Sequence, residues 1–438
     1  MNMIGKDTAK KATGKAKSSA KTLVQKTGLF SFGRSNDLTS KDVEVARKYI
    51  SVYWSKLERT HVKDDESLLG LPNPYLVPAS EEGHEFDFNE MYYWDSYFMV
   101  QGLYDEGHKE LVIGILENME SLFKRFKVIP NASRTYLMGR SQPPFLSSFI
   151  FEIYDTYGMD RDWLREHIEV AKKEYETVWM GTSKPNWRQV HKGLSRNYDI
   201  NMLHDLAEAE SGWDMTPRFN RKALNHLPVD LNSLLYKYET DFARAAKILD
   251  HKDEVAKWEK AAKQRSATMS KLMWDNSRGL FYDYNYVREK RATVSSLAAY
   301  YPMWAGMVDG RQAQALVKAL RRFEQKGGLS TTDALPLGQY VPGSLPTQWA
   351  YPNGWAPLQY LVILGLERYG YKQDARRIAM KWLRTNLDWF NTHGVFLEKY
   401  NTVNPEKPPM KGVYPSQTGF GWTNAVFERL CQMYIDEN

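Results

Sequence analysis

Cysteine is almost absent from this chain of 438 residues, which contains only Cys431. A single cysteine excludes an internal disulfide and any metal cluster built from several thiolates. No apolar run approaches the ~18 residues that a membrane-spanning helix requires, and the N-terminus lacks the apolar core of a secretory signal. We therefore expect no membrane span, and a cytoplasmic location.

Most of the chain also lacks an excess of positive or negative residues, although the total net charge is +6. Residues 1–34 contribute +7 of it, from eight Lys or Arg against Asp7, which leaves −1 for the rest. The globular part therefore has no phosphate-binding stripe, and we expect no nucleic-acid partner for it. Residues 1–36 are predicted to be a disordered basic tail, able to contact an anionic surface. A mitochondrial presequence fits less well, because the basic residues are nearly all Lys.

Several signatures of other chemistries are missing. The chain has no Walker-type loop, no Gly-x-Gly-x-x-Gly after a strand, no His-Glu-x-x-His helix and no Gly-x-Ser-x-Gly elbow. Its nine histidines are scattered, which favours structural roles over metal binding. No metal or organic cofactor is expected.

Amphipathic helical patterns, by contrast, recur along the whole chain after residue 36. Apolar residues return at three- and four-residue spacing, as in Val229, Leu231, Leu234, Leu235 and Tyr238. The patterns lie near 40–60, 94–106, 108–127, 146–158, 161–180, 228–249, 252–273, 294–304, 309–325, 354–370, 371–391 and 421–435. Twelve helices joined in pairs predict an all-α fold, an (α/α)6 barrel, as a single domain over residues 37–438.

Long segments rich in Gly, Pro and Trp separate the helix pairs. They cover residues 63–93, 128–145, 181–218, 328–353 and 392–420. Long loops in a compact helical domain are usually functional. We expect them to meet on one face of the barrel and to form one deep cleft, where the high aromatic content of 13% offers faces for sugar rings.

Three carboxylates within or directly beside these segments are candidates for catalysis. Asp214 follows Gly212 and Trp213, and an apolar ring beside a carboxyl favours its protonated form, which a glycosidase acid needs. Glu398 and Asp95 also stand among aromatic and apolar residues. Each has a structural alternative: Asp214 in a helix capped by Ser211, Glu398 as an exposed partner of a nearby lysine, and Asp95 as a helix N-cap.

The order of motifs resembles the trehalase family of inverting glycoside hydrolases from about residue 70 to 435, as a divergent member. The motifs that carry the resemblance are Tyr92–Phe98, Ile129–Asn131, Arg140–Pro144, Gly193–Arg196, Glu210–Asp214, Val229–Asn232, Gln348–Trp349, Tyr351–Trp355, Glu398–Tyr400 and Gln417–Asn424. The resemblance implies an (α/α)6 barrel, with Asp214 as general acid and Glu398 as the base that activates water. Inversion requires the two carboxyl groups roughly 6.5–9.5 Å apart.

The same resemblance implies Trp94, Asn131, Arg140 and Trp349 as sugar contacts. Further predicted sugar contacts are Asp95, Gln142, Trp213, Gln348, Trp355 and Trp422. The chain departs from the family pattern at Asp87, Ala350 and Val413 and in a short loop over residues 199–209. These changes spare the proposed acid and base but remove groups expected to hold a second glucose.

The sequence thus predicts an inverting α-glycosidase whose substrate is a small α-glucoside, with α,α-trehalose as the best single choice. One alternative is a related (α/α)6 glycosidase acting on another small α-glucoside or mannoside. The other is a sugar-binding pseudoenzyme without activity, although binding alone does not require a protonated acid opposite a base.

Overall fold

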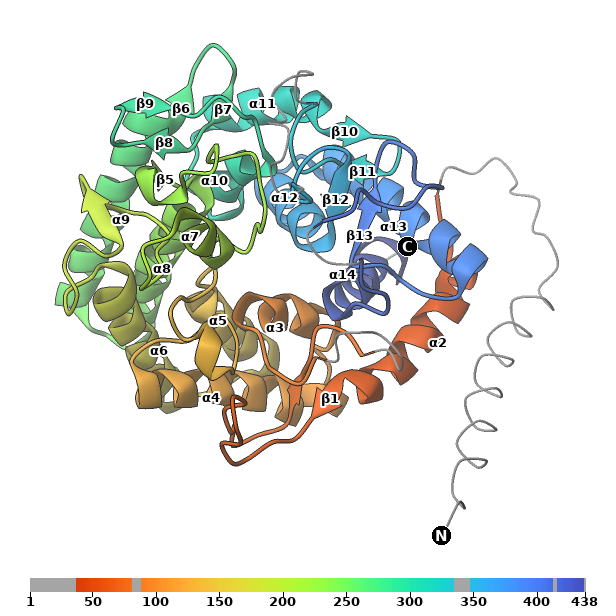
Figure 1. Ribbon diagram of the computed structural model, residues 1–438, viewed down its shortest axis with the longest axis horizontal. Helices are drawn as coiled ribbons and strands as arrows, with labels where there is room; N and C mark the ends of the chain where they lie inside the picture. The colour runs from red at the N-terminus through yellow and green to blue at the C-terminus, as the bar shows by residue number, and fades with distance from the viewer. Residues whose placement is uncertain (1–36, 81–87, 335–346, 413–415, 437–438) are drawn as a thin grey trace, which may run out of the picture.

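The structure, a computed structural model, describes residues 37–80, 88–334, 347–412 and 416–436. The predicted tail of residues 1–36 lies outside this range. Within it, helices form two concentric rings, and the chain alternates between the outer and the inner ring (Figure 1). This confirms the predicted all-α (α/α)6 barrel.

The inner ring contains α3 (Tyr93–Met99), α5 (Leu146–Tyr157), α8 (Val229–Ile248), α10 (Tyr301–Trp304), α12 (Ala356–Arg368) and α14 (Gly421–Cys431). Neighbouring inner helices pack against one another from α5 round to α3. The ring closes where Tyr97 of α3 stacks on Phe145 at 4.3 Å, at the start of α5. Inner helices are therefore apolar on most sides; in α12, every residue from Ala356 to Ile363 is buried.

The outer ring contains α2 (Ser40–Leu57), α4 (Lys109–Phe126), α6 (Arg161–Glu174), α9 (Lys252–Met273), α11 (Gly310–Ala319) and α13 (Lys372–His393). These helices bury only one stripe. In α9 the buried residues include Trp258, Ala262, Arg265 and Met269, which recur every three or four positions. None of the helices in the described part of the chain is long and apolar enough to cross a bilayer.

Local signals start and stop several helices. Thr39 and Asp42 form a capping box at α2, and the Asp160 side chain accepts a hydrogen bond from the Trp163 backbone at α6. Gly158 and Gly394 end α5 and α13 in the left-handed conformation that glycine adopts without strain. Such signals and the apolar period explain why all twelve predicted helical regions hold a helix.

Short elements fill the connections. The 3₁₀ helices are η1 (Val100–Gly102), η2 (Glu106–His108), η3 (Thr135–Leu137), η5 (Ala223–Asn225), η6 (Leu297–Tyr300) and η7 (Leu320–Arg322), and η4 (Tyr175–Trp179) and η8 (Gln432–Asp436) are π-helical turns. The predictions missed helix α7 (His204–Glu210), which stands inside the segment 181–218.

The strands are short and antiparallel. The pairs are β1 (Glu58–Arg59) with β2 (Tyr75–Leu76), β3 (Gln189–His191) with β4 (Leu194–Ser195), β6 (Trp274–Asp275) with β7 (Leu280–Phe281), β10 (Glu324–Gln325) with β11 (Gly328–Leu329), and β12 (Asn353–Trp355) with β13 (Lys399–Asn401); β8 (Tyr284–Asn285) pairs with both β5 (His226–Leu227) and β9 (Lys290–Arg291). The β12–β13 pair joins two of the long loops and positions part of the site.

Candidate active site

All five long loops contribute to one cavity of about 300 Å³. Its lining consists of Pro78, Phe88, Tyr92, Trp94, Asp95, Asn131, Leu137, Arg140, Gln142, Ala209, Gly212, Asp214, Trp349, Glu398, Gln417, Phe420 and Trp422. The starts of inner helices α3 and α14 supply the remaining wall. Three carboxyl groups and several aromatic faces therefore meet in one small-molecule-sized space.

Asp214 reaches the cavity through a tight turn after α7. Gly212 has a φ of +75°, and a Cβ atom there would lie 2.6 Å from the ring of Trp94. Only glycine satisfies both conditions, because other residues are strained at positive φ and carry that Cβ. The helix alternative is wrong: Ser211 is the C-cap of α7, and Asp214 follows in a bend outside any helix.

The surroundings of Asp214 favour its neutral form. Its side chain is partly exposed to the cavity but is enclosed by protein, and this desolvation raises its pKa from 3.8 to about 7. The negative charge of Glu398 acts in the same direction, whereas Arg140 and Lys399 oppose it. A carboxyl with this pKa holds a proton that it can donate near neutral pH.

The backbone around Asp214 is fixed by the segment that contains Trp349. The Gln348 side-chain amide donates to the Asp214 carbonyl at 2.7 Å, and the Trp349 backbone N–H donates to the Met215 carbonyl at 3.1 Å. On the other side, the Thr216 backbone N–H donates to the buried Glu208 carboxyl at 2.7 Å. The backbone that carries Asp214 is therefore fixed by hydrogen bonds from the 348–349 segment and from Glu208.

Glu398 stands at the cavity beside a buried lysine. It directly precedes β13, and the Lys399 ammonium donates to Glu398 Oε2 at 2.5 Å. Glu398 is 2% exposed and Lys399 is fully buried, so the alternative of an exposed ion pair is wrong, although Lys399 is the partner. The backbone carbonyl of Glu398 accepts from the Trp422 indole N–H at 3.1 Å. The carboxyl group of Glu398 therefore has a buried, positively charged partner at the cavity wall.

Asp95 is the third carboxyl of the cavity. It lies in the first turn of α3, where Tyr92 occupies the N-cap, so the N-cap alternative is wrong. Burial raises the pKa of Asp95 to about 8, and the charges of Glu398 and Asp214 add to this shift. A neutral carboxyl at this place can donate a hydrogen bond to a ligand hydroxyl as well as accept one.

The aromatic residues of the predicted set occupy two layers. Trp94, Trp349 and Trp422 line the cavity, and their rings lie 5.7–6.3 Å from one another. Trp213 and Trp355 are fully buried behind this wall and do not line the cavity. The Gln348 side chain is buried there too, engaged with the Asp214 carbonyl.

The 128–145 loop contributes polar side chains to the cavity lining. Asn131, Arg140 and Gln142 all line the cavity. Arg140 makes an ion pair with the buried Asp199 at 3.3 Å, and its Nε has no hydrogen-bond partner among the described residues. Arg140 therefore keeps one unpaired donor next to the cavity that it lines.

The buried carboxylate of Glu210, for which the sequence predicts no role, connects these loops. Glu210 accepts from the backbone N–H groups of Ser141 at 2.8 Å and Tyr198 at 2.7 Å, and it pairs with the Arg188 guanidinium. All these partners are distant in sequence, so no local pattern points to the network. The pairing of Lys399 with Glu398 did have a signal in the sequence, because the two residues are adjacent.

Two of the departures from the family pattern lie outside the described residues, and the others lie within them. Asp87 and Val413 lie outside the described residues. Ala350 is fully buried, and its methyl side chain offers no hydrogen bond. The short 199–209 loop contributes Asp199 to Arg140 and leaves apolar side chains exposed, among them Ile200 at 57%.

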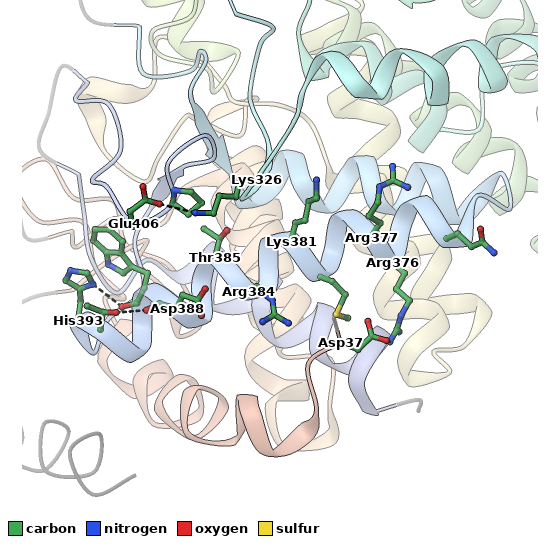
Figure 2. Close-up of a pocket in the computed structure, with 15 residues that line it drawn as sticks. Asp37, Lys326, Arg376, Arg377, Lys381, Arg384, Thr385, Asp388, His393 and Glu406 are labelled. Carbon is green, nitrogen blue, oxygen red and sulfur yellow. Dashed lines mark hydrogen bonds and ion pairs between the residues drawn. The ribbon is translucent and has the colours of Figure 1, made fainter. Parts of the chain in front are cut away.

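A larger cavity of about 710 Å³ lies along the outer side of α13 (Figure 2). None of the predicted site residues lines it. Several of its charged side chains pair with each other, as Arg376 does with Asp37 at 3.3 Å and Lys326 with Glu406 at 3.5 Å. It lacks the buried carboxyl beside an aromatic wall that the central cavity has, so it is the weaker candidate.

Fold and site define an (α/α)6-barrel protein with a carboxyl-lined cavity built from the loops of the ring. Within this class the chain belongs to the trehalase family: the family profile matches residues 3–202 and 181–434.

The cytosolic neutral trehalase of Kluyveromyces lactis is 32% identical over 438 residues, covering 84% of this chain and 57% of that protein. That of Emericella nidulans is 33% identical and covers 81% and 57%. The chain thus spans somewhat more than half the length of these relatives.

Solved structures agree with this placement. The neutral trehalase Nth1 from Saccharomyces cerevisiae superposes with a TM-score of 0.72 at 29% identity, covering 90% of this chain and 80% of that one. A mannosylglycerate hydrolase of family GH63 from Thermus thermophilus has a TM-score of 0.64 at 17% identity, covering 87% and 99%. The latter likeness supports the fold alone.

Proposed function

We propose that residues 37–438 form one catalytic domain that hydrolyses the glycosidic bond of a small α-glucoside, α,α-trehalose, with inversion. One observation carries the proposal: Asp214, whose pKa is raised to about 7 by burial, and Glu398, which is paired with Lys399, line the same aromatic cavity. Two carboxyl groups in opposite protonation states are what inverting glycoside hydrolysis requires. The fungal relatives are named cytosolic neutral trehalases, which supports the same substrate and a cytosolic location.

The proposed reaction assigns one proton transfer to each carboxyl. Asp214 gives its proton to the glycosidic oxygen as the bond from that oxygen to the anomeric carbon breaks. Glu398 takes a proton from a water molecule whose oxygen forms the new bond on the opposite face of the sugar. The two proton transfers balance, so the reaction needs no metal or organic cofactor.

The remaining cavity residues bind the sugar in this proposal. Trp94, Trp349 and Trp422 offer apolar faces to the C–H groups of the ring. The Trp349 indole N–H and Arg140 Nε are buried donors without partners in the described residues. An unpaired buried donor costs about 1–3 kcal/mol, which a sugar hydroxyl would recover.

A second substrate class has one specific observation in its favour. Where the family pattern has an acid, Ala350 presents a buried methyl group. This loss is compatible with a leaving group other than glucose, such as a small hydroxy acid on an α-glucoside or α-mannoside.

The test is sugar release by the purified full chain from α,α-trehalose, maltose and α-glucosides and α-mannosides of small acids. Asp214→Asn and Glu398→Gln should each lower kcat by about 10²–10⁴-fold. Asp388→Asn is the matched control, because Asp388 is an exposed carboxyl of the outer groove in Figure 2. No release from any sugar by the wild type would leave only the pseudoenzyme hypothesis; release from the acid glucosides but not from trehalose would support the second class.

A further inference from the structure

Three tryptophans behind and within the cavity wall are in successive ring contact and are called the stack here. The rings of Trp349 and Trp355 are parallel to within 1°, with centroids 3.7 Å apart, and the ring of Trp213 contacts Trp349 at 5.5 Å with a tilt of 30°. Only Trp349 lines the cavity; the two outer rings are fully buried. The outer rings therefore serve something other than direct contact with a sugar.

A cation covers each end of this stack. The Arg218 guanidinium lies 4.2 Å from the centre of the Trp213 ring, and the Lys399 ammonium lies 4.9 Å from that of Trp355. Because Trp349 covers one face of Trp355 at 3.7 Å, the ammonium lies over the other face. Cations attract the negative faces of aromatic rings, and the attraction is strongest where water is excluded.

The two ends of the stack are themselves anchored. Arg218 is 1% exposed and makes ion pairs with Asp230 at 2.6 Å and Asp283 at 2.8 Å. Its position is therefore fixed by two carboxylates. At the other end, Trp355 and Lys399 are direct partners in the β12–β13 register, so the cross-strand pairing sets their separation.

The stack connects the two proposed catalytic residues. Trp213 directly precedes Asp214 in the chain, and Lys399 directly follows Glu398 and hydrogen-bonds its carboxylate. The middle ring belongs to the segment that hydrogen-bonds the backbone at Asp214 and Met215. A displacement of any ring is thus transmitted to the separation of acid and base.

We infer that the cation-capped stack Arg218–Trp213–Trp349–Trp355–Lys399 sets the spacing of Asp214 and Glu398, and that Trp355 and Arg218 are positioning residues. The inference rests on the proposed function for its kinetic consequence, but its geometric content is independent of it. Trp213 and Trp355, which the sequence predicted as sugar contacts, act in this account through their neighbours.

The decisive variant is Trp355→Phe, which shortens the stack without altering the cavity lining. Trp258→Phe is the matched control, because Trp258 is also buried but packs on Tyr175 and Phe242, away from the cavity. A displacement of about 1 Å costs on the order of 10²-fold in rate. We expect kcat of Trp355→Phe to fall by about 10–100-fold with KM within about threefold of the wild type, while Trp258→Phe changes neither.

Arg218→Lys tests the opposite end, since lysine keeps the charge but cannot stack a planar guanidinium or form the bidentate pairs that Arg218 makes with Asp230 and Asp283. It should lower kcat in the same way. Unchanged kcat in both folded stack variants, or an equal loss in Trp258→Phe, would overturn the inference while leaving wild-type turnover, and so the proposed function, intact.

A crystal structure of Trp355→Phe measures the separation of the two carboxyl groups directly and does not depend on activity. It therefore remains informative if the wild type cleaves none of the sugars. The separation of the Asp214 and Glu398 carboxyl groups should change by about 1 Å relative to the wild type. An unchanged separation would refute it, whatever the activity.

Discussion

The desolvation of Asp214 predicts that replacing this residue lowers activity but raises the stability of the fold. Replacing this residue by Asn keeps its size but removes its charge, so Asp214→Asn should lower kcat by about 10²–10⁴-fold. It should also stabilise the fold at high pH. The reason is that ionising this carboxyl destabilises the folded protein, because burial raises its pKa to about 7.

The direction and size of this pH-dependent change in stability follow from the pKa of Asp214 in the unfolded and in the folded protein. In the unfolded chain Asp214 ionises near 3.8, and in the folded protein near 7. Between these values the folded state binds more protons, so the stability that this group contributes falls as pH rises and is lost in full above about pH 7. A shift of about 3 units corresponds to about 4 kcal/mol, which is an upper bound because cavity water also solvates the side chain.

The assay is chemical denaturation of wild type and Asp214→Asn at several pH values. At about pH 4 the two midpoints should nearly coincide, and the variant should become progressively more stable up to about pH 8. Asp388→Asn again serves as the control and should show a much weaker trend. Equal stability of wild type and Asp214→Asn at about pH 8 would refute the claim that protein surroundings hold this carboxyl neutral.

Two further predictions concern the architecture around the acid. Gly212→Ala should destabilise the fold by about 1–3 kcal/mol and lower activity, because φ is +75° and the new Cβ would meet the Trp94 ring at 2.6 Å; an unchanged melting temperature would contradict this. Arg188→Met should cost about 3–5 kcal/mol by leaving the buried Glu210 carboxylate without its cation, and the double variant with Glu210→Gln should recover part of that loss. A double variant no more stable than Arg188→Met would contradict the pairing.

Much of the fold could be predicted from sequence because its signals are local. The apolar period of three to four residues depends only on neighbouring positions, and it marked all twelve helical regions of the two rings. The five long loops were likewise visible as stretches rich in Gly, Pro and Trp, and all of them contribute to the cavity. Helix α7 was missed, because its seven residues show too little period to stand out from a loop.

The sequence predicted most of the residues that meet at the candidate site, but not which of them line the cavity and which are buried behind it. Motif order brought Trp213, Trp349 and Trp355 together as sugar contacts, yet only Trp349 lines the cavity. Which ring faces the cavity depends on stacking between segments more than a hundred residues apart, as with Trp213 and Trp349. Arg188 and Glu210 are only 22 residues apart, yet no local pattern indicates their pairing either. Sequence alone carries no information on such contacts.

The central claim is that Asp214 and Glu398 act as acid and base on opposite faces of one α-linked sugar. Proton NMR during the first minutes of hydrolysis of α,α-trehalose tests it most directly. Inversion at one anomeric carbon predicts equal amounts of β-glucose and α-glucose before mutarotation. The appearance of α-glucose alone would show retention and contradict the account.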